Sequence, residues 1–381
     1  MKKLVALLLI ALLVAGTLAG CYAEEPPVPT PEDPPAPATP VPMPTPEPEP
    51  TPHPNAANMQ IAWIEPSPGS FFHDGDRRGG WLGIQQFLDS HGLSSDHATR
   101  FQPHLDSDEA RIDLITYAID YWGANIIVMQ SHHFINASAA VQERFPDIKF
   151  ILLDATPAGG AAENLVAIHF AEEQAGFLAG YAAVMDGHRS LGFMGGIADP
   201  AIVRYGYGFL YGAEYAAAAL DLTEGEVTVR YTYLGDFAPS PDHAMMAAAW
   251  FEDGIEVIFT AAGHAGFSVI SAATYAGGLV IGADDDQSGV GEIVLTSAVK
   301  MLDAAVYDML TDILHEEFIG GRILRFDASN RGIGLPMDTS RFQTFTQAQY
   351  DAIFALLADG TIRVDDTHHE IVLHLVVLYE L

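Results

Sequence analysis

The stretch NLVAIHFAEEQAGFLAGYAAVMDGHRSLGFMGG, residues 164–196, shows the pattern that decides the fold. Its first seven residues form an apolar run of the kind found in strands that are buried on both faces. Residues 171–186 repeat apolar side chains at helical spacing, and a second apolar run follows at 190–196. A strand, a helix and a strand in this order indicate a parallel β-sheet. Gly176 and Gly180, four residues apart in the helix, are expected to allow close packing of the helix on the sheet.

The same alternation continues on both sides of this stretch. Further strands are predicted at 59–65, 125–129, 148–154, 226–233, 256–262, 278–284 and 292–297, and further helices at 79–90, 107–122, 200–220, 240–253, 266–276 and 298–315. About ten strands over this length fit two doubly wound α/β lobes better than a single sheet. Ligands of such sheets bind beyond the carboxyl ends of the strands, so the residues that follow each strand are the candidate binding residues. Those segments are rich in Gly, Asp and aromatic residues: 66–76, 130–134, 154–157, 195–200, 234–237, 261–266 and 283–287.

The N-terminus is predicted to be a lipoprotein signal peptide that ends at residue 20. Two lysines precede an apolar stretch at 4–16, which is shorter than the ~20 residues that a membrane-spanning helix needs. The sequence LAGC, residues 18–21, resembles a bacterial lipobox. That resemblance implies cleavage before Cys21 and a diacylglyceryl thioether on its sulfur; the alternative is an ordinary secretory signal with an incidental cysteine. Cys21 is the only cysteine of the chain, so an intramolecular disulfide is excluded.

A proline-rich tether is predicted to follow, so that residues 21–57 link the lipid to the folded part. Residues 26–54 contain 15 of the 24 prolines of the chain. Because proline fixes φ and lacks an N–H donor, this segment cannot form helix or sheet. At ~3.1 Å per residue it reaches at most ~90 Å. Such a spacer holds a folded domain away from a membrane surface or lets it reach through cell-wall material.

The composition narrows the class of protein. The chain carries 17 Lys and Arg against 50 Asp and Glu, which gives a formal net charge of −33. The acidic residues are scattered, so they indicate a solvated acidic surface, and such a surface repels nucleic-acid phosphates. Nucleic-acid binding is therefore not expected. No Gly-x-Ser-x-Gly, Walker A or His-Glu-x-x-His motif is present, so the sequence gives no support to those hydrolase and nucleotide-binding classes.

Two polar runs invite a metal-binding interpretation, and the sequence disfavours it for both. His132 and His133 are adjacent in QSHHF, residues 130–134, and adjacent side chains rarely point at one ion, so they are expected to be polar residues of the ligand cleft. The run Asp284–Asp286 lacks the spaced ligands of a calcium loop, so sugar binding by one of its members is favoured. The histidine pair at 368–369 is expected at the surface. We expect no metal and no cofactor.

Several segments, in order along the chain, resemble one known family. They are 171–184, 191–209, 235–241, 255–266, 281–287, 295–310 and 332–364. They resemble the basic membrane protein family, which comprises lipid-anchored substrate-binding proteins of ABC transporters related to purine nucleoside receptors. The resemblance implies a type I periplasmic-binding-protein fold, in which two α/β lobes joined by three crossovers hold the ligand in a cleft. The implied N-terminal lobe is 58–165 plus 288–325, and the implied C-terminal lobe is 166–287 plus 326–381.

The resemblance also implies which residues bind the ligand. Phe237 matches an aromatic residue that stacks on the base, and Gly263 matches a glycine that lies against the ligand. Asp284 matches an aspartate that holds the ribose hydroxyls, and Lys300, at the start of the predicted helix 298–315, matches a lysine that faces the sugar. The chemistry agrees, because a carboxylate accepts hydrogen bonds from two adjacent hydroxyls, while an ammonium donates to hydroxyls and balances the carboxylate.

The loop after the first strand departs from the family pattern. The family has a Ser-Phe-Asn stretch before a Trp, and its Phe stacks on the opposite face of the base. Here the loop reads EPSPGSFFHDGDRRGGW, residues 65–81, and keeps Trp81 but not the Ser-Phe-Asn stretch. Counting back from Trp81, Asp76 occupies the position of the Phe. Phe71 or Phe72 replaces the lost ring only if the loop is rebuilt, and Phe72 is our candidate.

These observations lead to one predicted function and two alternatives. We expect a monomeric, extracytoplasmic, lipid-anchored solute-binding protein of an ABC importer on a Gram-positive cell surface, which captures a nucleoside-like molecule and delivers it to a permease. Segment 130–134 also departs from the Pro-Gly-aromatic stretch that is common in the family, so the identity of the ligand stays open. The alternatives are a surface lipoprotein enzyme that acts on nucleosides and a ligand sensor that has no permease.

Overall fold

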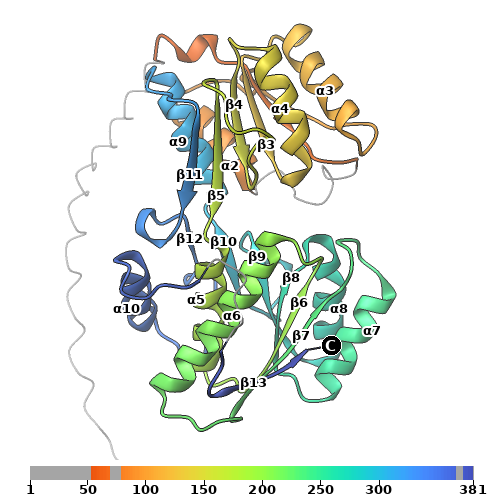
Figure 1. Ribbon diagram of the computed structural model, residues 1–381, viewed down its shortest axis with the longest axis vertical. Helices are drawn as coiled ribbons and strands as arrows, with labels where there is room; N and C mark the ends of the chain where they lie inside the picture. The colour runs from red at the N-terminus through yellow and green to blue at the C-terminus, as the bar shows by residue number, and fades with distance from the viewer. Residues whose placement is uncertain (1–52, 69–78, 366–371, 381) are drawn as a thin grey trace, which may run out of the picture. The chain divides into compact units, whose positions relative to one another are not determined.

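The computed structural model describes residues 53–68, 79–365 and 372–380 (Figure 1). The chain divides into two units, Met1–Pro48 and Glu49–Leu381, and all described residues belong to the second unit. Several predictions lie outside the described residues, namely those on Cys21, Phe71, Phe72, Asp76, His368 and His369. Among the described residues, no helix is both long and apolar enough to cross a membrane.

The first lobe is built on a six-stranded sheet in the order β11-β5-β4-β3-β1-β2, and all paired strands are parallel. Along β1 the side chains alternate: Ile61 and Trp63 share a core with two of the helices, α2 and α9, while Ala62 and Ile64 share a core with α3 and α4. Helices therefore cover both faces of the sheet. The elements are β1 (Ile61–Ile64), α2 (Gly79–Ser90), β2 (Ala98–Phe101), α3 (Asp108–Asp120), β3 (Ile126–Gln130), α4 (Ile135–Arg144), β4 (Lys149–Leu153), β5 (Leu165–Phe170), α9 (Leu302–Leu314) and β11 (Arg322–Phe326).

The second lobe is built on a seven-stranded sheet in the order β12-β10-β9-β8-β6-β7-β13, and only the pair β10–β12 is antiparallel. Phe193 of β6 shares a core with α5 and α6, and its neighbour Met194 shares a core with α7 and α8. The elements are α5 (Glu172–Met185), β6 (Ser190–Gly195), α6 (Pro200–Ala219), β7 (Val227–Tyr233), α7 (Pro241–Glu252), β8 (Val257–Ala261), α8 (Gly266–Ala276), β9 (Leu279–Asp284), β10 (Val294–Lys300), β12 (Ile333–Gly334), α10 (Gln347–Ala358) and β13 (Val376–Glu380).

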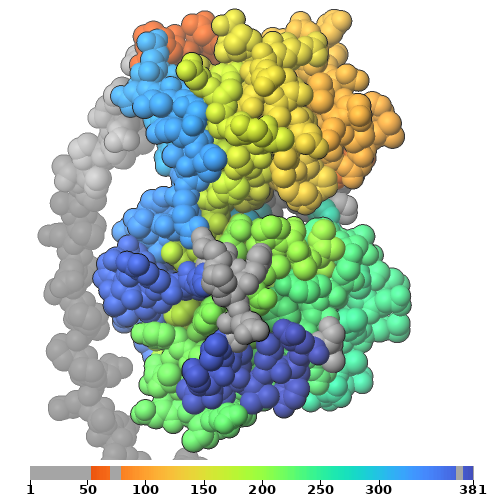
Figure 2. Space-filling model, in the orientation of Figure 1, coloured from red at the N-terminus to blue at the C-terminus, as the bar shows by residue number. Residues whose placement is uncertain are grey.

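The C-terminal end of the chain returns to the second lobe. Strand β13 pairs in parallel with β7, so that Val376 lies opposite Val227. The carboxylate of Glu214, on α6, accepts hydrogen bonds of 2.9–3.1 Å from the backbone N–H groups of residues 374–376. In Figure 2 the dark-blue C-terminal residues lie against the green surface of this lobe. Single-turn 3-10 helices complete the fold: η1 (Ala56–Asn58), η3 (Ser95–His97), η4 (His132–Phe134), η5 (Gly263–Ala265), η6 (Ser288–Val290) and η7 (Ala328–Asn330).

The chain passes between the two sheets three times, after β5, after β10 and after β11. The stretch 164–196, which indicated one unit of parallel sheet, is therefore split: β5 pairs with β4 in the first sheet, whereas β6 pairs with β7 and β8 in the second. The predicted lobe boundaries are wrong at two places for the same reason, since 166–170 belong to the first sheet and 294–300 to the second. The sequence of a buried strand does not say which sheet it joins.

Strand β10 also ends later than its sequence indicated. The helix predicted at 298–315 begins at Leu302, because Val294–Lys300 continues the strand. Lys300 is thus the last residue of a strand and does not lie in the first turn of a helix. The strands that the sequence did not reveal (β2, β11 and β12) all lie at sheet edges, and so does β13, which belongs to a terminal stretch that is strand-like in sequence. Edge strands lack the continuous apolar run of a buried strand, and Arg322–Phe326 alternates half-buried and exposed residues.

Glycines allow α5 and α6 to pack backbone against backbone. A Cβ on Gly176 would lie 2.2 Å from the carbonyl oxygen of Tyr205, and one on Gly180 would lie 2.0 Å from that of Phe209. Helix α6 makes the same contact in return through glycines 208 and 212, whose Cβ atoms would lie 2.0 Å from carbonyl oxygens of α5. The close packing expected for Gly176 and Gly180 is therefore between two helices and not between a helix and the sheet.

Candidate functional site

One buried ammonium group joins strand ends of the two sheets. Lys300, the last residue of β10, is 7% exposed. Its Nζ lies 3.1 Å from Asp154 Oδ1, 3.0 Å from Glu172 Oε1 and 3.2 Å from Asp284 Oδ1. Asp154 follows β4 in the first lobe, whereas Glu172 begins α5 and Asp284 ends β9 in the second. We call these four residues the Lys300 cluster.

The backbone explains why the carboxylates meet there. Asp154 and Asp284 have φ values of 62° and 69°, in the left-handed region that aspartate enters more readily than bulky residues. Asp284 lies opposite Val299 in the ladder between β9 and β10, so the next residue, Lys300, is its neighbour. The structure thus brings together Asp284 and Lys300, the two sugar-binding residues implied by the family resemblance.

The charges in this cluster are unequal. Burial lowers the pKa of Lys300, but the carboxylates of Asp154, Asp284 and Glu172 together raise it well above its usual value. Burial raises the pKa of Asp154 to about 6, and the nearby ammonium only partly opposes this shift. One ammonium thus faces three carboxylates, and among the ion pairs of the described residues Glu172 has a second cation, Arg204, with its Nε at 2.7 Å. The site therefore favours a neutral or cationic ligand over an anionic one.

Asp284 is the carboxylate through which this cluster can reach a ligand. Its side chain is 44% exposed, compared with 14% for Asp154 and 2% for Glu172. Tyr205 of α6 places its hydroxyl 3.2 Å from Asp284 Oδ1 and 3.2 Å from the carbonyl oxygen of Ala298. Burial raises the pKa of Tyr205 well above its usual value, so the phenol stays protonated and acts as a donor. Asp284 is thus held in place on one oxygen.

A second buried acid lies beside the cluster at the crossovers. Glu173 is fully buried, and its Oε1 lies 2.5 Å from Nη2 of Arg325, the penultimate residue of β11. Burial raises the pKa of Glu173 to about 7, and Arg325 opposes this shift. The ion pair links the start of α5 to the end of β11, and therefore connects two of the three crossovers.

Phe237 and Gly263 lie side by side after β7 and β8. A Cβ on Gly263 would lie 3.4 Å from Phe237 Cδ1, and one on Gly196 would lie 2.2 Å from Phe237 Cε1. The backbone N–H of Ala265 donates a hydrogen bond of 2.9 Å to the carbonyl oxygen of Phe237. The half-buried ring therefore rests on two glycines, which follow β6 and β8 on the same side of β7 in the sheet order, and this support fixes its orientation.

His133 lies at the carboxyl end of β3 in the first lobe. Its Nδ1 is 2.8 Å from Ser131 Oγ, and its ring stacks on His132 with centroids 4.2 Å apart. Ser131 has a φ of 105°, an unusual value that turns the chain sharply after the strand. Burial, then His132 and Arg111, lower the pKa of His133, so its imidazole is neutral at pH 7. The described residues contain no group of three or more His, Cys, Asp or Glu side chains that could hold a metal ion.

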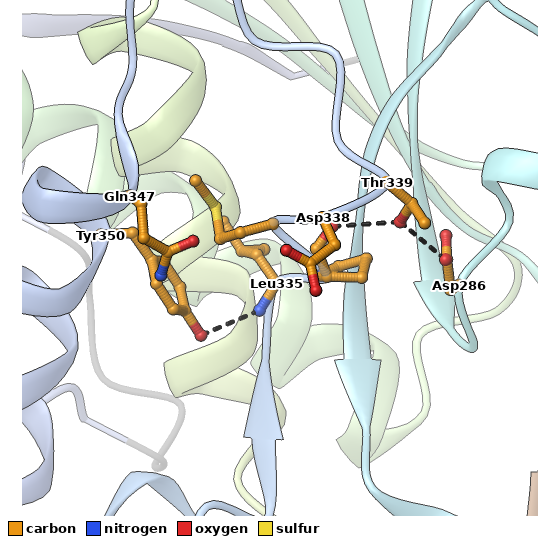
Figure 3. Close-up of a pocket in the computed structure, with 8 residues that line it drawn as sticks. Asp286, Leu335, Asp338, Thr339, Gln347 and Tyr350 are labelled. Carbon is orange, nitrogen blue, oxygen red and sulfur yellow. Dashed lines mark hydrogen bonds between the residues drawn. The ribbon is translucent and has the colours of Figure 1, made fainter. Parts of the chain in front are cut away.

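The three consecutive aspartates 284–286 contact three different partners. Asp284 contacts Lys300, Asp285 Oδ1 accepts a 3.0 Å hydrogen bond from the N–H of Gly79, and Asp286 Oδ2 accepts one of 2.7 Å from Thr339 Oγ1. Figure 3 shows the contact with Thr339 at one end of a cavity of 580 Å³. None of the binding residues implied by the resemblance lines that cavity, which is formed by Asp286, Leu335, Pro336, Met337, Asp338, Thr339, Gln347 and Tyr350.

Sequence reasoning singled out neither Glu172 nor Tyr205, and it included Asp154 only as part of the candidate segment 154–157. Asp154 belongs to a segment that follows a strand, and this position was the only signal for it. Glu172 is an acidic residue in the first turn of a helix. Acidic residues at this position commonly stabilise the helix and have no other role. Tyr205 is 1% exposed, like an ordinary aromatic residue of the core. Nothing in the sequence around Tyr205 indicates that its hydroxyl contacts the carboxylate of Asp284.

Comparison with known proteins identifies the family of this chain. The family model for the PnrA-like ABC transporter substrate-binding proteins matches residues 70–363, well over half of the chain. The chain belongs to this family. The family is one of substrate-binding proteins and not one of enzymes, and the resemblance stated from the sequence is confirmed.

Curated relatives carry the names of the same family. Basic membrane protein B of Borreliella burgdorferi is 31% identical over 224 residues, which cover 56% of this chain and 63% of the relative. Basic membrane protein A of Borreliella afzelii is 25% identical over 248 residues, which cover 64% of this chain and 74% of the relative. The match with the first relative thus covers less than two thirds of that protein's length.

Solved structures confirm the type I periplasmic-binding-protein fold. An ABC transporter solute-binding protein from Conexibacter woesei has a TM-score of 0.64 at 20% identity, with 81% of this chain and 99% of that chain covered. A solute-binding protein from Aeropyrum pernix has a TM-score of 0.62 at 21% identity, with 80% of each chain covered. At these identities the likeness concerns the fold alone.

Proposed function

We propose that this chain is the extracytoplasmic receptor of an ABC importer, which binds a nucleoside-like solute between its lobes and delivers it to a permease. The observation that carries this proposal is the pair of Asp284 and Lys300 at the strand ends, with Asp284 partly exposed and held on one oxygen. A ribose diol offers two hydroxyl donors to such a carboxylate. Phe237, supported by glycines, offers a flat face to a base.

The acidic surroundings refine the ligand class. Three carboxylates around one ammonium disfavour a phosphate group, so the proposed ligand is a nucleoside and not a nucleotide. His133, neutral and at a strand end of the first lobe, is the proposed contact on the opposite side of the ligand. A neutral imidazole offers one donor and one acceptor, which suits the edge of a base.

Replacing Phe237 by alanine tests the stacking. The loss of a stacked base costs about 1–3 kcal/mol, so we expect the affinity for adenosine in calorimetry to fall roughly 5- to 150-fold. Ribose has no base, so its binding should not change. Phe318→Ala is the matched control, because Phe318 is a half-buried ring of the first lobe that packs near Lys149.

Two results would contradict the proposal. An absence of binding by adenosine, inosine and cytidine at millimolar concentration would refute the nucleoside ligand, although not a receptor for another solute. Release of free base from inosine or adenosine, detected by chromatography, would instead show an enzyme that acts on nucleosides.

The lipid anchor on Cys21 is part of the same proposal. The lipobox and the tether support it; the lipobox and residues 21–52 of the tether lie in the N-terminal segment that the structure does not describe, whereas residues 53–57 of the predicted tether are described as part of the folded unit. Mass spectrometry of the N-terminal peptide from the membrane fraction tests it. We expect a diacylglyceryl group on Cys21, and a peptide with a free thiol at this position would refute the anchor.

A further inference from the structure

Asp285 connects the second lobe to a helix of the first lobe. Its Oδ1 accepts a 3.0 Å hydrogen bond from the N–H of Gly79, the first residue of α2. A carboxylate at this end of a helix is favourable, because the N-terminal N–H groups lack partners within the helix and carry partial positive charge. Here the carboxylate that meets the helix comes from the loop after β9.

Helix α2 is fixed tightly to the rest of the first lobe. A Cβ on Gly83 would lie 2.2 Å from the carbonyl oxygen of Asp303 in α9, and one on Gly80 would lie 2.7 Å from the ring of Trp63 in β1. The helix, α9 and the sheet therefore move as one body. Any force on Gly79 acts on the whole first lobe.

The contact between Asp285 and Gly79 borders an open space. A cavity of 360 Å³ lies beside it. Residues of α2, of the loop after β9, of the end of β10 and the start of α9, and of the segment after β12 line it: Gly79, Leu82, Asp285, Asp286, Val299, Lys300, Met301, Asp303 and Pro336. Close packing does not enforce the hydrogen bond on this side. The lobes can therefore separate beside this cavity without opening a packed core.

We propose that Asp285 is a positioning residue that ties the two lobes together before any ligand binds. The tie favours the arrangement in which Asp154 of the first lobe and Asp284 of the second share the ammonium of Lys300. Asp285 would act on ligand affinity only by raising the fraction of molecules that are competent to bind. The effect on ligand affinity rests on the proposed function, whereas the connection of the two lobes through Asp285 does not.

Distances between the lobes in the ligand-free protein test the proposal. The full chain with Cys21→Ser carries no native thiol, so Glu143→Cys on α4 and Ser271→Cys on α8 can be spin-labelled selectively. Pulsed electron paramagnetic resonance then measures the distribution of distances between the lobes. We expect Asp285→Ala to move the ratio of the two lobe arrangements roughly tenfold toward the separated one, as for the loss of a charged hydrogen bond.

Asp286→Ala is the matched control. It removes the same charge one residue away, but its partner Thr339 belongs to the segment that follows β12 in the second lobe, so the distances should not change. Asp285→Asn keeps an acceptor oxygen and should lie between Asp285→Ala and the wild type; it also serves if Asp285→Ala does not fold. Distributions that are the same for Asp285→Ala and Asp286→Ala would overturn the proposal. A separate experiment adds adenosine. If the wild-type protein does not bind adenosine, the proposed function is contradicted, but the comparison of the ligand-free variants stays valid.

Discussion

Lys300→Met is expected to abolish ligand binding and to lower the free energy of unfolding by about 3–5 kcal/mol at pH 8, as for the removal of one partner from a buried ion pair. Methionine keeps most of the apolar stem and removes the charge. Three carboxylates then lose their shared cation. Glu172 keeps Arg204, and Asp284 keeps Tyr205. Asp154 is affected most, because the hydrogen bond that its side chain accepts from Gln130 is 3.4 Å long.

The loss of stability in this variant should depend on pH. The pKa of Asp154 is about 6 with Lys300 in place, and it rises further once the ammonium is gone. An aspartate in an unfolded chain has a pKa of about 3.9, so between these values the folded state binds a proton that the unfolded state does not. Lowering the pH through this range therefore stabilises the folded variant. We expect the difference from wild type to be largest at pH 8 and clearly smaller at pH 5.5.

Urea unfolding at both pH values measures this effect. The double variant Lys300→Met with Asp154→Asn removes the unpaired charge, so it should recover part of the lost stability at pH 8 without recovering binding. A single Lys300→Met variant that is as stable as wild type at pH 8 would show that the Lys300 cluster does not hold its carboxylates by charge.

Gly180→Ala is expected to destabilise the protein by about 3 kcal/mol, at the upper end of what overpacking usually costs. The added Cβ would lie 2.0 Å from the carbonyl oxygen of Phe209, and backbone cannot rotate away as a side chain can. Helices α5 and α6 must therefore separate. Because α5 carries Glu172, ligand binding should weaken as well.

Gly289→Ala is the control for this substitution. A Cβ at Gly289 meets no atom within 4 Å, so its effect on the free energy of unfolding should be small. Urea denaturation of both variants measures the two changes in the free energy of unfolding. A Gly180→Ala protein within about 0.5 kcal/mol of wild type, the usual range for surface substitutions, would mean that the two helices do not need this close approach.

The strands that the sequence revealed are those buried in the middle of a sheet. Residues 165–170 and 190–195 form apolar runs because helices cover both faces of their sheets. The edge strand Arg322–Phe326 has one open side and mixed polarity, so it gave no such run. The order of the sheets could not be predicted either, since strand pairing depends on contacts between segments that are distant in sequence.

The site was predictable where the family resemblance names the residue. Asp284 and Lys300 followed from the family resemblance, and the structure places them 3.2 Å apart. Glu172 could not be predicted, because the same residue at the start of a helix is usually a stabilising acid and nothing more. Its role depends on the first crossover, which brings the start of α5 to the end of β10.

The central claim is that Asp284 and Lys300 hold the hydroxyls of a nucleoside. Calorimetry with adenosine and with 2′,3′-dideoxyadenosine tests it most directly, because the two ligands share the base and differ only in the two hydroxyls. We predict saturable one-to-one binding of adenosine and an affinity for the dideoxy analogue that is lower by about 100-fold or more, since the buried polar groups would then lack partners. Equal affinities for the two ligands would contradict the account.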